Sequence, residues 1–356
     1  TAGLFDLTRW RSSIYVDDPI IHVRGNAADR RRMLVRTVAV WLGLGFRLAF
    51  NKAAYAPMGT KITWTSGTII VHDDCVIVSI KQTIIDEVTT ETKDFLSKNV
   101  IGKEALRAYL GRLVCISSLI FTWRPFVSMM WAPLYQSAAC GNAPAGCIWT
   151  SQIKTPLYWV KAFLDGNAGG IERKFVLADY LGHGDDVVIT CDASVYGFGA
   201  FLMENGSYSE YFYDQPTELE HRMFDSETGD NTGQQTWEAL ILLIALRLWA
   251  PRWKNKRVRL AVRSDSVTAL TAILKMSSPS TNTSIIAREI ALDVGDSVYR
   301  PTIVQHLPGV SNTIADALSR IFEPDAFNGV PEALRACTQR QAPERPASWW
   351  RALSPP

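Results

Sequence analysis

The chain has 356 residues, of which 47% are hydrophobic and 20% are charged, and its formal net charge is +2. This length suits two or three domains with ample cores, and the composition excludes a disordered or collagen-like chain. A net charge this close to zero neither indicates nor excludes a nucleic-acid partner, because a large acidic site cancels local basic surface in the sum.

The six cysteines are scattered along the chain, and no pair has CxxC spacing. We therefore expect reduced thiols rather than a disulfide framework or a structural zinc site. The most apolar run, Ala239–Ala250, contains Arg247 and is too short to span a bilayer, and the N-terminus has no apolar signal core. These features predict an intracellular protein, in the cytoplasm or the nucleus, with no membrane partner. The chain does not begin with Met, which favours a piece of a longer polyprotein.

The hydrophobic pattern changes several times along the chain. The first part alternates apolar and polar positions over short runs joined by one longer segment, Ala28–Leu44, which predicts hairpins and one helix. Apolar positions then recur every three or four residues, as at Leu106, Leu110 and Leu113, which predicts helices. A stretch rich in Gly, Ala and Pro begins at Ser137 and predicts a connector, after which an α/β pattern follows.

Two carboxylates lie at the ends of elements predicted early in this α/β region. The strand Val187–Cys191 leads into Asp192, and two glycines separate it from a second strand, as in a hairpin. Glu238 lies near the start of QQTWEALILLIALRLW, a predicted helix that is apolar nearly all round and must therefore be buried. A buried carboxylate is costly unless a cation compensates it, although the helix dipole also favours an acid near a helix N-terminus.

Two further carboxylates follow the same pattern. In RVRLAVRSDS a predicted strand ends at Asp265, before another helix. In HLPGVSNTIADALSR, Asp316 falls in the early turns of a helix that Ser311 or Asn312 can cap. If the strands before Asp192 and Asp265 are parallel neighbours, both side chains lie at the C-terminal edge of one sheet. Four carboxylates at one edge suit Mg²⁺ or Mn²⁺, which prefer oxygen ligands, and a pair of such ions hydrolyses phosphodiesters.

The four motifs CDAS, TWEAL, RSDS and HLPGVSNTIADALSR, in this order, closely resemble the ribonuclease H domain of retrotransposon polyproteins of the gypsy and DIRS types. The resemblance covers about residues 184–322. It implies a mixed five-stranded sheet with flanking helices and cleavage of the RNA strand of RNA–DNA hybrids. It also implies that four carboxylates are catalytic and bind the metal: Asp192, Glu238, Asp265 and Asp316. We interpret His306, in the HLPG segment, as structural rather than catalytic.

Bacterial enzymes of this superfamily hold the hybrid with a basic helical protrusion. The corresponding stretch here, SSPSTNTSIIAREIALDV, is not basic. We therefore expect the contacts that hold the substrate to come from another part of the chain.

Near the N-terminus, SIYVDDPIIHV places Asp17 and Asp18 between two short apolar strands. Asp favours β-turns by itself, but the segment resembles the YVDD hairpin of reverse-transcriptase palms. That resemblance implies that Asp17 and Asp18 are catalytic and bind Mg²⁺. Downstream, LGLGFRLAFNKAAY resembles the palm motif that ends in a lysine, here Lys52, and KITWTSGTI resembles the strands that hold the primer end, around Trp64. ALRAYLGRL and TWRPFVSMMWAPLY resemble the helical thumb and connection.

Arg30 and Arg31 belong to a run of arginines on the first predicted helix. Such a run is as typical of a solvated helix face as of contacts with the phosphates of template–primer nucleic acid. With Lys52 and Trp64, they are the candidate nucleic-acid-binding residues.

A polymerase site also needs a third carboxylate from an earlier palm strand and the fingers that bind the incoming nucleotide, and the residues before the YVDD segment contain neither of these parts. We therefore expect that this chain alone does not extend a primer.

Together these patterns predict an α/β (α+β) chain with five segments: a partial palm (1–80), thumb and connection helices (81–150), a connector (151–183), an RNase H-like domain (184–322) and a Pro-rich tail (323–356). The predicted function is that of a retroelement reverse transcriptase/RNase H fragment with an incomplete polymerase part. One rival is a decayed or host-retained copy that binds nucleic acid without turnover. Another is a related two-metal nuclease that cuts DNA or resolves junctions. The sequence leaves the oligomeric state open.

Overall fold

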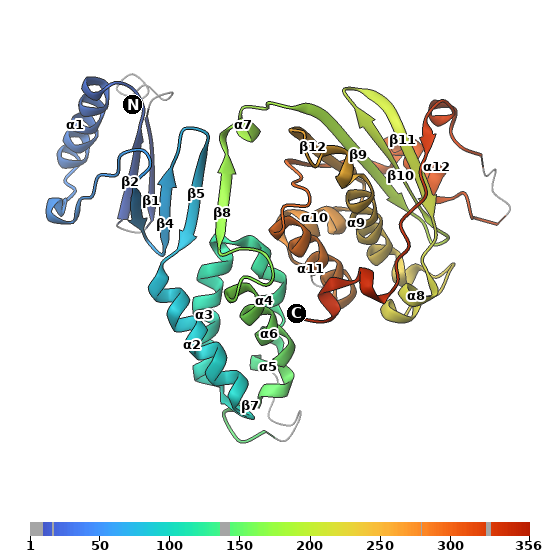
Figure 1. The fold of residues 1–356 in the computed structure, drawn as a ribbon, viewed down its shortest axis with the longest axis horizontal. Coiled ribbons are helices and arrows are strands. Elements are labelled where there is room, and N and C mark those ends of the chain that lie inside the picture. The colour runs from blue at the N-terminus through green and yellow to red at the C-terminus, as the bar shows by residue number, and fades with distance from the viewer. Residues whose placement is uncertain (1–9, 16–17, 136–142, 279, 325–328) are drawn as a thin grey trace. The chain divides into compact units, whose positions relative to one another are not determined.

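The computed structural model describes residues 10–15, 18–135, 143–278, 280–324 and 329–356. The chain forms two compact units, Thr1–Lys81 and Gln82–Pro356 (Figure 1). Strands and helices occur in both units, and the second contains a mixed sheet with flanking helices, so the expected fold class is confirmed. Within the described ranges, no helix combines the length and apolar character that crossing a bilayer requires.

The first unit consists of a hairpin, a helix and a second antiparallel sheet. Its main elements are β1 (Trp10–Tyr15), β2 (Asp18–Val23), α1 (Ala27–Gly43), β3 (Lys61–Trp64), β4 (Gly67–Val71) and β5 (Cys75–Ile80). Strand β1 pairs with β2, and β4 lies between β3 and β5, in each case antiparallel. Asn26 begins α1, where its side chain accepts a 2.8 Å hydrogen bond from the backbone N–H of Asp29. The hairpins and the helix expected from the sequence are therefore present.

The second unit begins with a helical region. Its elements are α2 (Gln82–Ser97), β6 (Val100–Gly102), α3 (Lys103–Leu119), α4 (Arg124–Ser128), α5 (Trp131–Tyr135), β7 (Cys147–Trp149) and α6 (Lys154–Leu164). Aromatic side chains fill its core: the ring centroids of Phe126 and Trp159 lie 4.9 Å apart, and those of Trp123 and Phe163 lie 5.0 Å apart. Trp123 and Phe126 are thus core residues.

A mixed sheet forms the centre of the rest of the second unit. The elements here are β8 (Glu172–Val176), α7 (Leu177–Tyr180), β9 (Asp185–Ala193), β10 (Phe198–Glu204), β11 (Ser207–Asp214), α8 (Glu218–Phe224), α9 (Gln234–Trp253), β12 (Val258–Ser264), α10 (Val267–Lys275), α11 (Thr281–Gly295), β13 (Ile303–His306), α12 (Thr313–Ser319) and β14 (Thr338–Gln339). The strand order is β13-β12-β9-β10-β11-β14. Strands β9, β10 and β11 are antiparallel neighbours, whereas β12 and β13 run parallel to β9.

Helices α9 and α12 cover opposite faces of this sheet. Side chains alternate between the two faces along each strand. On β11, Tyr211 packs with Leu318 of α12, whereas the ring of Phe212 lies 5.5 Å from that of Trp249 on α9. Helix α9 is buried over most of its length, which explains why its sequence is apolar nearly all round.

A close approach between β10 and α12 depends on Gly199. A Cβ atom at this position would lie 2.2 Å from Leu318 Cβ and 2.8 Å from the backbone N of Ser319. Contacts this short do not occur between real side chains, so glycine is needed for α12 to lie against the sheet.

Residues 329–356 pack on the domain instead of extending from it as a tail. Strand β14 pairs parallel with β11, and Leu334 and Trp350 are buried. The buried Arg345 forms 2.7 Å ion pairs with Glu220 and Asp214. Little in the amino-acid pattern indicates this packing, because isolated side chains anchor the segment and produce no helical or strand periodicity. The assignment of segments to palm, thumb and connection stays a prediction.

Replacing Gly199 with Ala is expected to destabilise the second unit by about 3 kcal/mol, because the added methyl group overlaps α12. Chemical denaturation of the whole chain measures the change. Gly111→Ala is the matched control: no atom lies within 4 Å of its Cβ position in α3, so this variant should gain up to about 1 kcal/mol. Equal stability of the two variants would contradict the close approach of α12.

Replacing Arg345 with Met is expected to cost about 3–5 kcal/mol, because it leaves the fully buried Glu220 carboxylate without its cation. Arg340→Met serves as the control, since this side chain is half exposed and lies 3.5 Å from Glu210. Its loss should change the free energy of unfolding by less than about 1 kcal/mol. If Arg345→Met were equally mild, the segment would not be part of the folded domain.

Candidate metal centre

Two carboxylates meet at the C-terminal edge of the sheet because β9 and β12 are parallel neighbours. Asp192 is the penultimate residue of β9, and Asp265 directly follows the last residue of β12. The register pairs Arg263 with Thr190, which brings the ends of both strands to the same edge. The sequence left open whether these two strands are parallel neighbours, and the structure shows that they are.

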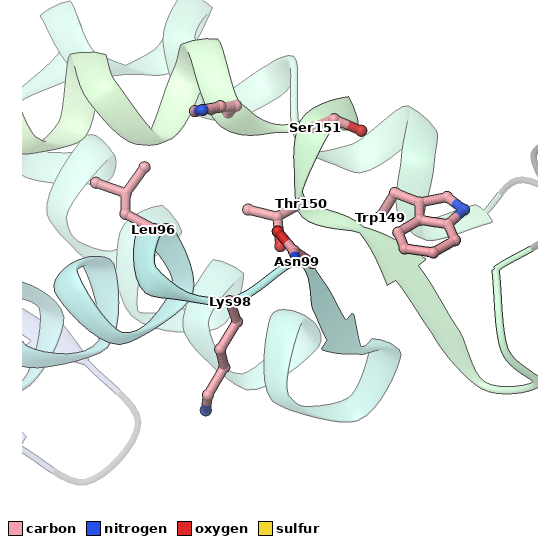
Figure 2. A pocket seen from close by; sticks show the side chains of 7 residues that line it. Leu96, Lys98, Asn99, Trp149, Thr150 and Ser151 are labelled. Atoms are coloured by element: carbon pink, nitrogen blue, oxygen red, sulfur yellow. The ribbon is translucent and has the colours of Figure 1, made fainter.

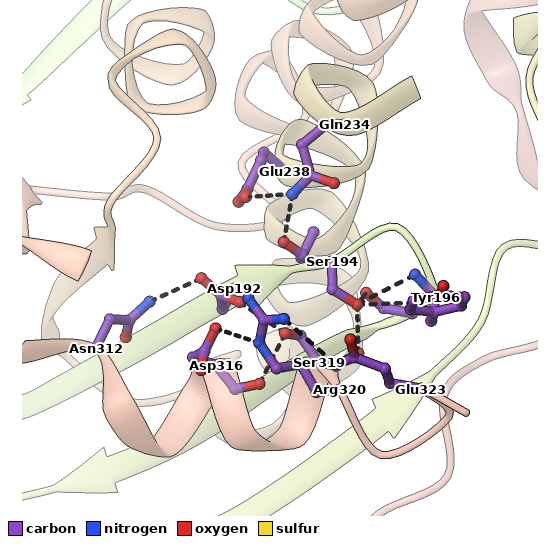
Figure 3. A network of polar contacts seen from close by, with 12 residues as sticks. Asp192, Ser194, Tyr196, Gln234, Glu238, Asn312, Asp316, Ser319, Arg320 and Glu323 are labelled. Atoms are coloured by element: carbon purple, nitrogen blue, oxygen red, sulfur yellow. Dashed lines mark hydrogen bonds and ion pairs between the residues drawn. The ribbon is translucent and has the colours of Figure 1, made fainter. Parts of the chain in front are cut away.

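A third carboxylate reaches this edge from α9. Glu238 lies in the second turn of that helix, and the side-chain amide of Gln234, one turn earlier, donates a 3.2 Å hydrogen bond to its Oε1. Gln234 also donates to the backbone carbonyl of Ala193 and so links α9 to the end of β9 (Figure 3). Oxygen atoms of Asp192, Glu238 and Asp265 lie within 4.8 Å of one another.

Helix α12 places Asp316 beside this cluster. Figure 3 shows Asp316 and Asp192 on facing elements, with the guanidinium of Arg320 close to both. Arg320 Nε donates a 2.8 Å hydrogen bond to Asp316 Oδ1, and the Asp316 side chain is 43% exposed. Asp316 thus borders the three-carboxylate group, and a cation bound through it must compete with Arg320.

Asp192 is held in place by two side chains from the closing motif. The hydroxyl of Ser319 donates a 2.7 Å hydrogen bond to Asp192 Oδ2, and the amide of Asn312 donates to Oδ1 at 3.2 Å and to the carbonyl of Cys191 at 3.1 Å. Ser194 fixes Ser319 in turn by donating a 2.7 Å hydrogen bond to its carbonyl. These contacts orient the Asp192 carboxylate before any ligand arrives.

The sequence did not identify Ser319, Gln234 or Arg320, and it assigned Asn312 another task. Asn312 was expected as a possible helix cap, but it makes no side-chain capping bond to α12 and binds Asp192 instead. The available signal was only that each of these residues lies three or four positions from a predicted carboxylate. His306, the exposed last residue of β13, pairs with Ser264 next to Asp265.

Burial and mutual repulsion alter the ionisation of the cluster. The pKa of Asp192 is raised to about 7, chiefly by burial and also by the negative charges of Asp265 and Asp316, against the hydrogen bond from Ser319. Burial likewise raises the pKa of Glu238 well above its usual value, with contributions from Asp192 and Asp265. The folded chain therefore holds negative charge here only at a considerable cost.

The cluster suits a divalent cation. Glu238 Oε2 and Asp265 Oδ1 are buried atoms without a hydrogen-bond partner among the described residues. Unpaired buried carboxylate oxygens are costly, and a bound cation would satisfy them. The donors are all hard oxygen atoms, the ligands that Mg²⁺, Mn²⁺ and Ca²⁺ prefer.

The candidate residues of the first unit form no comparable cluster in the part that the structure describes. Asp17 lies outside the described residues. Asp18 begins β2 and is exposed, and its carbonyl accepts a 3.0 Å hydrogen bond from the indole N–H of Trp64. Lys52 is exposed, as are Arg30 and Arg31 on α1. The roles of these residues stay predictions.

A cavity of about 280 Å³ lies in the helical region, apart from the carboxylates. Lys98, Asn99, Trp149 and Thr150 are among its lining residues, and none of the residues that line it is acidic (Figure 2). It therefore offers none of the ligands that make the sheet edge suitable for a cation.

Without metal, the protein is expected to lose stability as pH rises from about 4 to about 7, because the folded state binds more protons than the unfolded state across this window. Replacing Asp192 with Asn removes one of the repelling charges. At about pH 8 in a chelator, the variant should be more stable than the wild type by about 1–3 kcal/mol. Added Mg²⁺ should raise the melting temperature of the wild type and not of the variant.

The matched control is Asp225→Asn, at an exposed carboxylate in the left-handed conformation that Asn tolerates well. It should leave both the pH dependence and the response to Mg²⁺ unchanged. A wild type that gains stability as pH rises through the same window would contradict the assigned burial of the cluster.

No protein-family model and no curated protein matches the sequence. Among solved structures, a foamy viral protease-reverse transcriptase in complex with double-stranded DNA is 16% identical, with a TM-score of 0.36, and the match covers 83% of this chain and 46% of that one. The same viral protein in complex with an RNA/DNA hybrid is 13% identical, with a TM-score of 0.34 and coverages of 85% and 36%. RNase H1 from the halophilic archaeon Halobacterium salinarum is 16% identical, with a TM-score of 0.29 and coverages of 40% and 98%. The chain thus spans about half or less of these viral chains, and matches this distant do not identify its family or its activity.

Proposed function

We propose that the second unit is a ribonuclease H-type endonuclease that hydrolyses the RNA strand of RNA–DNA hybrids. The observation that carries the proposal is the meeting of Asp192, Glu238 and Asp265, with oxygen atoms within 4.8 Å of one another at one sheet edge. Two of their buried oxygens have no protein donor among the described residues, as expected of metal ligands. The order of the sequence motifs around them supports the same activity.

Asp192, Glu238, Asp265 and Asp316 would hold Mg²⁺ or Mn²⁺. Such ions, when bound, activate water and stabilise the leaving oxygen in phosphodiester hydrolysis. The chain's own contribution is to fix the ligands: Ser319 and Asn312 set the orientation of Asp192, and Gln234 holds Glu238. Because α9 and α12 bury the inner side of the cluster, the low local dielectric strengthens the attraction between these carboxylates and a cation.

We also propose that the chain is a part of a reverse transcriptase of a gypsy- or DIRS-type retroelement polyprotein. This proposal rests on the YVDD segment and the motifs that follow it, in the order palm, thumb, connection and nuclease. The corresponding partners are RNA–DNA hybrids and template–primer nucleic acid, inside the cell. Primer extension is not proposed for this chain.

The test is cleavage of a labelled RNA–DNA hybrid in Mg²⁺, with single-stranded RNA and duplex DNA as alternative substrates. We expect cutting of the RNA strand of the hybrid alone. Asp192→Asn, Glu238→Gln and Asp265→Asn should each lower the rate by at least about 100-fold, because each removes a charged ligand. Asp225→Asn is the control and should keep full activity.

Melting curves establish that the variants are folded. A folded wild type that binds the hybrid without cutting it would favour a decayed protein that only binds nucleic acid. Equal cutting of duplex DNA would favour a two-metal DNA nuclease.

A further inference from the structure

An arginine with no polar partner among the described residues stacks on two aromatic rings in the second unit. The guanidinium carbon of Arg173, on β8, lies 4.3 Å from the ring centroid of Phe121 and 4.4 Å from that of Phe175. Phe175 is two residues further along the same strand, and therefore on the same side of it. Stacking restricts the guanidinium to one plane and leaves its N–H groups free at the edge of that plane.

No described residue forms a hydrogen bond or an ion pair with the Arg173 guanidinium. Partial burial lowers the pKa of Arg173, and the nearby positive charges of Arg300 and Arg124 lower it too, against the opposing effect of Tyr180. An anion that joined the group would stabilise this half-buried cation beside like charges.

The two neighbouring arginines are themselves held in position. Arg300 donates a 2.9 Å hydrogen bond to the carbonyl of Lys174 and pairs with Asp179 at 3.2 Å. Arg124 donates from Nε to the carbonyl of Ser117 at 3.0 Å. Among the described residues, Asp179 is the one carboxylate that pairs with any of these three guanidinium groups, and it pairs with Arg300. The cluster therefore keeps excess positive charge.

The cluster lies away from the carboxylates. Arg300 precedes β13, whereas His306 ends that strand beside Asp265. Six residues of extended chain correspond to about 20 Å. A ligand at the arginines would therefore not touch the metal centre, and substitutions there should leave the carboxylates undisturbed.

We propose that Arg173, with Arg124 and Arg300, binds a phosphate group of the nucleic-acid backbone and helps to hold the hybrid on the enzyme. The planar guanidinium edge matches the geometry of phosphate oxygens, and a fixed side chain loses little entropy on binding. The choice of nucleic acid as the source of the phosphate rests on the proposed nuclease function.

The lack of basic side chains on α11 supports this assignment. This helix lies in the stretch that corresponds to the basic protrusion of the bacterial enzymes. Its one basic residue, Arg288, is buried against Met129. Contacts to the hybrid backbone therefore have to come from another surface, and the arginine cluster on β8 provides one.

The experiment measures binding of a fluorescent RNA–DNA hybrid in a chelator, where no cleavage occurs, over a range of salt concentrations. Arg173→Gln should weaken binding roughly tenfold at low salt, and the slope of log affinity against log salt should fall by about one. Arg173→Lys should retain part of the affinity, since it keeps the charge but not the planar edge. Arg259→Gln is the control, because Arg259 is a partly exposed arginine on β12, in a different sheet from β8, and pairs with Asp186 at 3.2 Å.

Arg300→Gln is the second test variant, because that side chain is exposed and its loss should not affect folding; it should reduce the affinity in the same direction. Millimolar inorganic phosphate, at constant ionic strength, should not displace the hybrid. Displacement by phosphate would show a site for the free anion and overturn the assignment to a nucleic-acid backbone.

Wild-type affinity and an unchanged salt slope in folded Arg173→Gln would also overturn the proposal. The nuclease function is judged separately: a wild type that binds the hybrid through Arg173 but never cuts it would remove the function and keep this site. A wild type that cuts the hybrid, together with unchanged binding in Arg173→Gln, would remove this site and keep the nuclease function.

Discussion

The burial of several negative charges at one sheet edge is the constraint on which the second unit depends. Asp192 and Glu238 are almost completely enclosed, and their shared repulsion with Asp265 raises the pKa of both. Hydrogen bonds from Ser319, Asn312 and Gln234 offset only part of this cost. The cluster is therefore organised but incomplete, and bound cations would remove both the repulsion and the unpaired oxygens.

Helix α12 connects the fold to the site. It lies against β10 because Gly199 has no side chain, and this contact brings Ser319 onto Asp192 and Asp316 beside it. The same face carries a small apolar core to which Leu334 of the C-terminal segment contributes. Packing far from the carboxylates thus determines how accurately they are held. Arg320, already paired with Asp316, keeps a positive charge near the cluster in the absence of metal.

Much of this arrangement could be predicted from the sequence, because strands and helices set the positions of their terminal residues. The strands that end near Asp192 and Asp265, the buried helix around Glu238 and the closing helix at Asp316 all follow from local patterns. The parallel pairing of β9 and β12 does not, because the two strands lie far apart along the chain. The supporting residues could not be predicted, since a serine, an asparagine or a glutamine is equally common on any surface. The packing of residues 329–356 could not be predicted either, because it depends on single buried side chains such as Arg345 and Trp350. The stacked Arg173 was missed for a similar reason: Phe121 lies 52 positions away along the chain.

The chemical ends of RNA fragments produced by the chain would test the central claim most directly. Hydrolysis by a water molecule at a metal centre leaves a 3′-hydroxyl on one fragment and a 5′-phosphate on the other. Attack by the neighbouring 2′-hydroxyl of the RNA, which needs no metal-bound water, leaves a 2′,3′-cyclic phosphate instead. Our account predicts 3′-hydroxyl ends, produced only when Mg²⁺ or Mn²⁺ is present and lost in Asp192→Asn. Cyclic phosphate ends, or cutting that persists in a chelator, would contradict it.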